Sequence, residues 1–326
     1  MPLPFILGGL ALAAAGYGVK KGIDALDADC EADKFIEKAE NLKEEATKKA
    51  KSAESDCKLA FARFGEKKLR VLSHSVSNFL DHFHRLNRSR ITIEGINMQD
   101  IQRQVSDARN LLNQLNANGI DGDSAPGVIA GFGSLGISSF TTGAVLGGGL
   151  AASGLAGMAV IGGLVAGPAL AIFGAISADE MEKKRDDAKA YLSQVEAAVK
   201  KADVMIDNLK SIEKMAICFT RQITKIDALF FSLSQGAIAT MKKHHYDISL
   251  YNQKEKDQLC VTVSTLSSLS AFLKVPIMDE HQKLNKKAQN ALNLMQNQIN
   301  ALESGQKSGH YDVAMIQSNQ TSLENL

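Results

Sequence analysis

The stretch that decides the fold is 124–178, which reads SAPGVIAGFGSLGISSFTTGAVLGGGLAASGLAGMAVIGGLVAGPALAIFGAISA. It runs for about 55 residues without one Asp, Glu, Lys or Arg, whereas 22% of the whole chain is charged. It also holds 14 of the 26 glycines, so its composition sets it apart from the residues on both sides. An uncharged stretch of this length is typical of helices that lie in a membrane.

Small residues recur at helical spacing within this stretch. Residues four apart share one face of a helix, and a face of Gly, Ala and Ser lets two helix backbones approach closely. Such faces associate helices in a membrane, where water supplies no hydrophobic drive between them. We expect eight glycines to serve in membrane insertion and helix packing: Gly127, Gly131, Gly143, Gly147, Gly157, Gly163, Gly167 and Gly174.

The length of the stretch favours a helical hairpin over 125–178. As one helix it would be about 80 Å long, against a hydrocarbon core about 30 Å thick, so two passes fit better than one. The glycine run 147–149 is the natural bend. The first arm is the weaker span because several hydroxyl side chains interrupt it. Two alternatives remain open, a hairpin buried permanently inside a water-soluble helical bundle and a flexible apolar loop.

The composition of the whole chain predicts an all-α fold. The five prolines leave residues 5–125 and 169–275 almost free of helix breakers, so long helices are permitted there. Aromatic residues make up only 6% and Trp is absent, which is ordinary for a core of Ala and Leu. We expect an elongated bundle of long coiled-coil-like helices with a central Gly-rich apolar helical hairpin.

Apolar and small residues at steps of three, four or seven form a seam along both flanks of the hairpin. Alanines at 46, 50 and 53 predict close helix approach, and the two long helices are expected to pack antiparallel with the hairpin closing one end. The expected segments are an apolar N-terminus at 1–22, a helical rod with a following helix (97–116) at 23–124, the hairpin at 125–178, a long helix at 179–250, C-terminal helices at 251–305 and a loose polar tail at 306–326.

The N-terminal residues 2–19 are uncharged and are followed by Lys20 and Lys21. A secretory signal carries its positive charge before the apolar core, so this order argues against cleavage. We expect either a peripheral membrane anchor or an apolar end that packs against the hairpin, through Phe5, Ile6 and Leu7. The protein is then expected to be made in the cytosol, to join a membrane in its active state and to need no cleaved signal if secreted.

Several classes of function find no support in the sequence. A net charge of +1 offers no footprint for nucleic acid. The lone match to GxGxxG at 131–136 follows no predicted strand, and no nucleophile motif occurs, so we expect neither an enzyme nor a cofactor. His82 and His84, with His74 before them, point to different sides of a helix, and His244-His245 reads as an exposed loop or helix end. No metal site is therefore expected.

With its glycine-rich hairpin set between long helices with alanine seams, the chain resembles the α-helical pore-forming toxins of the cytolysin A type and, more loosely, the apolipoprotein L proteins. The resemblance is one of architecture over 23–247, and the uncharged N-terminus departs from it. It implies a soluble form with the hairpin folded against the bundle and a membrane form with the hairpin released. It assigns no role to an individual residue.

Two functional hypotheses follow from these patterns. The first is a membrane-active helical protein that inserts the hairpin and oligomerises, with a lipid membrane and either its own copies or a related helical subunit as partners. The second is a soluble coiled-coil scaffold or partner subunit in which the hairpin is core and never inserts.

Overall fold

The computed structural model describes residues 29–86, 98–117, 178–278 and 284–326. Every regular element in these four ranges is a helix, including short 3-10 and π segments. The all-α prediction is therefore confirmed for the part of the chain that the structure describes.

The chain divides into two compact units. The described part of unit 1 consists of 29–57 and 178–211, and that of unit 2 consists of 58–86, 98–117, 212–278 and 284–326. Because each unit joins segments from distant parts of the sequence, neither is a continuous piece of chain.

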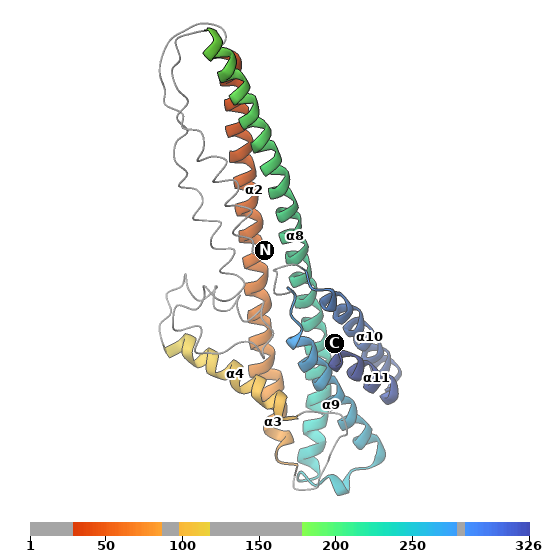
Figure 1. The fold of residues 1–326 in the computed structure, drawn as a ribbon. Coiled ribbons are helices and arrows are strands. Elements are labelled where there is room, and N and C mark those ends of the chain that lie inside the picture. The colour runs from red at the N-terminus through yellow and green to blue at the C-terminus, as the bar shows by residue number, and fades with distance from the viewer. Residues whose placement is uncertain (1–28, 87–97, 118–177, 279–283) are drawn as a thin grey trace. The chain divides into compact units, whose positions relative to one another are not determined.

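Two long helices contribute residues to both units: α2 spans Asp29–Arg70 and α8 spans Ala178–Lys243 (Figure 1). Both lack proline, which permits their length. On α2, Lys48 lies 2.7 Å from Glu44 in an exposed ion pair one helical turn apart. A solvent-exposed pair of this kind adds little to the stability of a helix. Helices of this length therefore depend on packing along their apolar faces.

Unit 1 is held by a small apolar cluster between α2 and α8. Ala39 of α2 is buried there against Tyr191, Leu192 and Val195 of α8. The Tyr191 hydroxyl donates a hydrogen bond to Glu40 Oε1 at 2.8 Å, so the buried ring keeps a polar partner. The predicted alanine seam is confirmed, since Ala46, Ala50 and Ala53 are all buried.

The contacts of unit 1 also give the relative direction of the two helices. The Lys189 ammonium of α8 lies 5.6 Å from the centre of the Phe35 ring of α2. Further along both helices, Lys38 Nζ lies 3.2 Å from Glu196 Oε1. Residue numbers rise together on the two helices, so α2 and α8 are parallel within this unit.

Unit 2 repeats this direction, and the expected antiparallel packing is wrong. The Phe64 ring on α2 lies 5.7 Å from Phe219 on α8, and the Phe79 ring lies 5.6 Å from Phe230 further along. An apolar seam determines which face of a helix is buried. It does not determine whether two helices are parallel or antiparallel, because both arrangements bury the same face.

At the centre of unit 2 lies α9 (Gln253–Lys274), whose residues 261–273 are all buried. A helix that is buried on every face needs neighbours all round. Its neighbours are α4 (Met98–Ala117), α10 (Lys286–Ser308) and α11 (Val313–Glu324), together with the second half of α8. The remaining elements are η1 (Val71–Val76, a π-helix), α3 (Ser77–Phe83) and η5 (Ile248–Leu250, a 3-10 helix).

Serines and threonines of α9 make polar contacts inside this core. Gln104 Nε2 of α4 donates to Ser270 Oγ at 2.6 Å, and Gln298 Nε2 of α10 donates to Ser268 Oγ at 3.1 Å. The Thr265 hydroxyl donates to a backbone carbonyl one turn earlier, at 2.7 Å. Buried hydroxyl and amide groups are tolerated when they find such partners.

The C-terminal segment 306–326 is not the loose tail expected from its polar composition. Within it, α11 begins at its N-cap Asp312, whose side chain accepts from Met315 N at 3.0 Å. Ile316 and Leu323 lie two turns apart on the buried side of α11. Together with a hydrogen bond from Ser267 Oγ to Glu324 Oε1 at 2.8 Å, these side chains dock α11 on α9.

The predicted hairpin and the predicted anchor lie outside the described residues. This applies to Phe5, Ile6 and Leu7 and to Gly127, Gly131, Gly143, Gly147, Gly157, Gly163, Gly167 and Gly174. Among the helices of the described ranges, none has both the length and the apolar composition that a membrane crossing requires.

Candidate functional site at the turn between α8 and α9

The turn from His244 to Tyr251 in unit 2 brings several titratable side chains into contact, among them His244, Tyr251 and Glu255. It begins with unusual backbone, since His245 has φ +50° and Tyr246 has φ +64°. They are the non-glycine residues with positive φ in the described ranges. A side chain in this left-handed region costs roughly 1–2 kcal/mol, so contacts made by the turn must hold it there.

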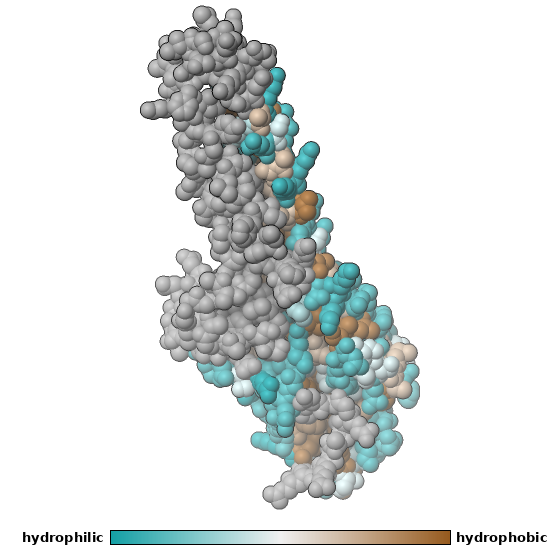
Figure 2. Space-filling model, viewed as in Figure 1, coloured by the Kyte–Doolittle hydropathy of each residue, from teal (hydrophilic) through white to brown (hydrophobic). Residues whose placement is uncertain are grey.

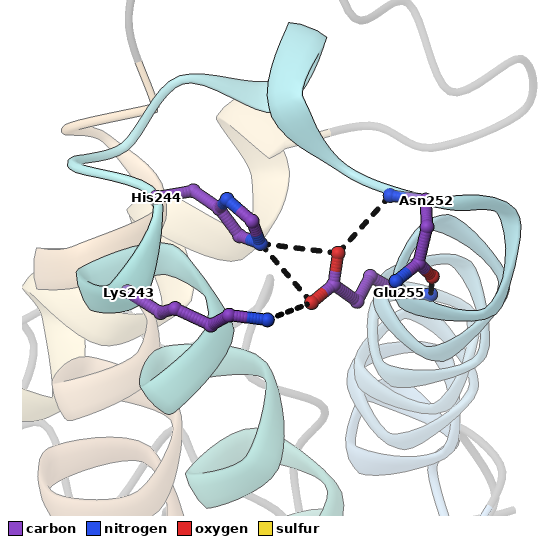
Figure 3. Close-up of polar contacts among 4 residues, drawn as sticks. All are labelled: Lys243, His244, Asn252 and Glu255. Atoms are coloured by element: carbon purple, nitrogen blue, oxygen red, sulfur yellow. Dashed lines mark hydrogen bonds and ion pairs between the residues drawn. The ribbon is translucent and has the colours of Figure 1, made fainter.

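Glu255 is the first of these contacts (Figure 3). His244 Nε2 lies 3.0 Å from one of its carboxylate oxygens and 3.1 Å from the other, and Lys243 Nζ lies 2.9 Å from the first. An ionised carboxylate only accepts hydrogen bonds, so Nε2 carries a proton in this contact. Glu255 therefore ties the end of α8 to the start of α9.

The same carboxylate also caps α9. Asn252 N donates to Glu255 Oε2 at 3.0 Å, and Glu255 N donates to Asn252 Oδ1 at 2.9 Å. These reciprocal bonds form a capping box, which satisfies two backbone donors at a helix start. The bonds from His244, from the Asn252 backbone and from Lys243, in that order, lower the pKa of Glu255 to about 2. Its negative charge is thus present at every physiological pH.

A second contact joins Tyr246 to the end of α3. The His82 ring stacks on the Tyr246 ring at 6.0 Å and within 5° of parallel, and His82 Nδ1 lies 2.8 Å from the Tyr246 hydroxyl. Burial, then the charges of Lys242 and Arg85, lower the pKa of His82. The ring is therefore neutral at neutral pH, and Nδ1 of the Nε2-protonated tautomer accepts from the hydroxyl.

Tyr251 completes the turn. It is 4% exposed, its ring lies 5.2 Å from that of His244, and its hydroxyl is buried without a hydrogen-bond partner among the described residues. Burial and the nearby carboxylates Glu255 and Asp247 raise its pKa to about 12. The phenol therefore stays neutral and acts as part of the packing.

This arrangement fastens helices together. His244 binds Glu255 at the start of α9, and His82 at the end of α3 binds Tyr246. An open depression of about 310 Å³ lies along α2 in unit 1 and is lined by Lys34, Glu37, Lys38, Asn41, Leu42 and Glu45. Charged and amide residues of this kind are typical of the solvated side of a helix.

The three histidines considered for a metal have different neighbours in the structure. His74 Nδ1 lies 2.9 Å from Ser73 Oγ, His84 lies beside Gln102, and His82 contacts Tyr246. Within the described ranges, no three His, Cys, Asp or Glu side chains are placed to hold a metal ion.

The sequence predicted an exposed loop or helix end at His244-His245. The pair does follow the end of α8 and His245 is exposed, but the side chain of His244 is only 16% exposed and binds Glu255. The signal that this prediction missed is Asn252-x-x-Glu255 before the apolar run of α9, which is the pattern of a capping box. When a capping carboxylate follows shortly after a helix break that contains a His, the spacing favours a contact between the His side chain and the carboxylate.

Comparison with known proteins does not assign this chain. It matches no family model, no curated protein and no solved structure at a significant level. Its function must therefore be argued from its own residues.

Proposed function

We propose that this protein is a membrane-active helical protein that inserts the glycine-rich stretch 125–178 as a hairpin and oligomerises through it. The observation that carries the proposal is the absence of charge over about 55 residues, combined with small residues four apart. Such a stretch fits two passes of a bilayer, and its small residues fit close helix contact within one. The proposed action is perturbation of the membrane or formation of a pore, without catalysis.

In this proposal the described helices form the water-soluble body of the protein. Their seams cover one another, as the Ala39 cluster in unit 1 and the phenylalanine pairs in unit 2 show. Charged helix α8 begins at Ala178, where the uncharged stretch ends. In this proposal the body is an elongated helical bundle that carries the hairpin in the connection between two parallel helices.

The soluble state in this proposal follows from the resemblance to cytolysin A-type toxins. That resemblance implies a hairpin that folds against the helical bundle until it is released into a membrane. Release of the hairpin would leave α2 and α8 paired through their own contacts, such as those around Ala39 and between Phe64 and Phe219.

A soluble scaffold is the second candidate, and one observation favours it. The first arm of the stretch is mildly polar in its middle, at Ser134, Ser138, Ser139, Thr141 and Thr142. Hydroxyl groups of this kind also occur in a protein core, such as that around α9 in unit 2. In this alternative the stretch is permanent core of a coiled-coil protein made in the cytosol.

Flotation with liposomes separates the two candidates. We expect the purified chain to float with vesicles and to resist extraction from them at alkaline pH. Residues 125–178 should resist cleavage by protease only when vesicles are present. A chain that never floats, and whose stretch resists protease equally with and without vesicles, would sink the proposal in favour of the scaffold.

Substitution of Gly163 by Leu tests the assembly step. Leu adds apolar area but separates two close helices, so flotation should persist while cross-linked oligomers in the membrane are lost. Gly148, in the predicted bend, offers a control, because Leu there leaves the packing face unchanged. Oligomers of the Gly163→Leu variant equal to those of the parent would contradict the assembly claim.

A further inference from the structure

The exposed residues of α8 in unit 2 form a continuous face. Between Lys214 and Lys243 the exposed residues recur every three or four positions, so they form one stripe along the helix. We call it the α8 stripe. Its length at 1.5 Å per residue is about 45 Å.

The α8 stripe carries one sign of charge. Its exposed charged residues are Lys214, Arg221, Lys225, Lys242 and Lys243, and no acidic residue is exposed on it. The acidic residue within this part of α8, Asp227, is only 16% exposed and lies 2.8 Å from Lys67 Nζ. A chain with 37 basic and 36 acidic residues gives no reason to expect such a run of one sign.

The stripe also exposes large apolar side chains. Ile217 is 42% exposed and Phe231 is 52% exposed. They are 14 residues apart, which places them about 40° apart around the helix axis, with the small exposed residues Thr224 and Ala228 between them. Figure 2 shows one face of the molecule, on which hydrophobic residues lie among mostly hydrophilic ones in the part that the structure describes.

We propose that the α8 stripe binds the surface of a lipid bilayer that contains anionic lipids. Basic residues beside exposed Phe and Ile are the pattern of a helix that lies in a membrane interface, with ammonium and guanidinium groups at lipid phosphates and the apolar side chains among the upper acyl chains. The complementarity of charge selects the anionic headgroup. This docking does not use the stretch 125–178, so it stands or falls separately from the proposed insertion.

Two other occupants fit the stripe less well. In a pair of copies that met through it, the basic side chains Arg221 and Lys225 of both would enter one interface with no exposed carboxylate to pair with. A nucleic acid would accept the basic residues, but it would leave Ile217 and Phe231 against a charged backbone.

The test uses the full chain and vesicles of phosphatidylcholine with and without about one third phosphatidylserine. The double variant Arg221→Gln/Lys225→Gln removes two basic side chains from the stripe. Each is expected to weaken binding to the phosphatidylserine vesicles about fivefold, so the double variant should bind about 25-fold more weakly. Binding by the parent should weaken as salt is added and should be low on pure phosphatidylcholine.

Unit 1 supplies matched controls on the same helix. Lys200 and Lys201 are exposed on α8, so Lys200→Gln/Lys201→Gln makes the same change in net charge away from the stripe. Val204 is 70% exposed and gives the apolar control, Val204→Ser, for Phe231→Ser. We expect both control variants to bind within about twofold of the parent and Phe231→Ser to bind several-fold more weakly.

Equal loss in the stripe variants and their controls would overturn the proposal, because binding would then follow net charge alone. Unchanged binding in the stripe variants would also overturn it. A lower mass of Phe231→Ser in solution, with vesicle binding unchanged, would show that the stripe pairs copies of the chain instead. Resistance to alkaline extraction reports the proposed insertion separately: a parent that binds in a salt-sensitive way but is always extracted supports the stripe and contradicts insertion.

Discussion

Units 1 and 2 are built on the same two helices but differ in what covers them. In unit 1 the apolar cluster that joins α2 to α8 has a small residue on the α2 side, Ala39, which packs against Tyr191, Leu192 and Val195 of α8. In unit 2 the second halves of these helices are joined by α4, α9, α10 and α11, and the side chains that meet are large. Phe219 alone stacks on Phe272 at 4.4 Å and meets the edge of Phe64.

This difference teaches that one seam pattern can support two levels of stability. Alanine allows close approach but buries little apolar area, whereas a buried phenylalanine contributes several times more. The described parts of α2 and α8 in unit 1 also keep many exposed residues, while residues 261–273 of α9 are all buried. We expect unit 1 to open locally at a lower free energy than unit 2, which hydrogen exchange would measure amide by amide.

The largest effect is expected from Phe219→Ala in unit 2. Loss of a fully buried ring leaves a cavity between α2, α8 and α9 and should cost about 3–5 kcal/mol in the free energy of unfolding. Thermal melting and the exchange of α9 amides would measure it. The control is Phe231→Ala on the exposed side of α8, which should stay within about 0.5 kcal/mol. Equal losses in the two variants would break the contrast between core and surface.

In unit 1, Ala50→Leu should destabilise by overpacking. Ala50 is 8% exposed on the seam, so the added side chain has to displace its neighbours at a cost of about 1–3 kcal/mol. Faster amide exchange should be confined to residues 29–57 and 178–211, with α9 unchanged. Lys51→Leu, on the exposed side of the next residue, is the matched control. Faster exchange in α9 as well would mean that the units do not open separately.

A smaller loss is expected when the cap of α9 is removed. Asn252→Ala deletes the acceptor of Glu255 N and should cost about 0.5–2 kcal/mol, seen as a lower melting temperature of unit 2. Gln253→Ala, at the neighbouring exposed position, keeps the capping box and serves as the reference. No difference between the two variants would show that the start of α9 is held by packing alone.

The smallest effect concerns pH. Because the pKa of His82 is lowered from 6.5 in the folded chain, the folded state binds the proton less readily than the unfolded chain. This contribution to stability is complete above about pH 6.5 and is lost as the pH falls through that value toward the folded pKa. Melting of the parent between pH 7.5 and 5 should therefore fall more steeply than that of His82→Gln. His84→Gln is the control, and parallel slopes in parent and His82→Gln would contradict the sign.

Some of this fold could be predicted from the sequence. The absence of proline and the three-four spacing indicated the long helix that begins near Asp179, and the same spacing indicated the helix near 97–116, which is α4 within one residue at each end. The alanine seam also predicted correctly which side of α2 is buried. These features depend on local periodicity, which a single sequence displays directly.

The errors have a common physical origin. The direction of α8 against α2 and the docking of α11 depend on contacts between residues far apart in sequence, which no local pattern encodes. Ile316 and Leu323 are two apolar side chains in a polar segment, too few to register as a seam. The contact of His244 with Glu255 could have been predicted from the local sequence, because the capping box is a short pattern with a known geometry.

The contacts between α4 and α9 can form only after the ribosome has added α9, long after α4. Ser270 receives its hydrogen bond from Gln104, which precedes it by 166 residues, and Asp100 receives Lys274 across 174 residues. At about 5–20 residues per second, the ribosome needs roughly 10–30 seconds to add the segment that covers α4. During that interval the apolar face of α4, with the whole uncharged stretch behind it, emerges before its cover. The apolar surface of the nascent chain is therefore exposed before the core that buries it can form.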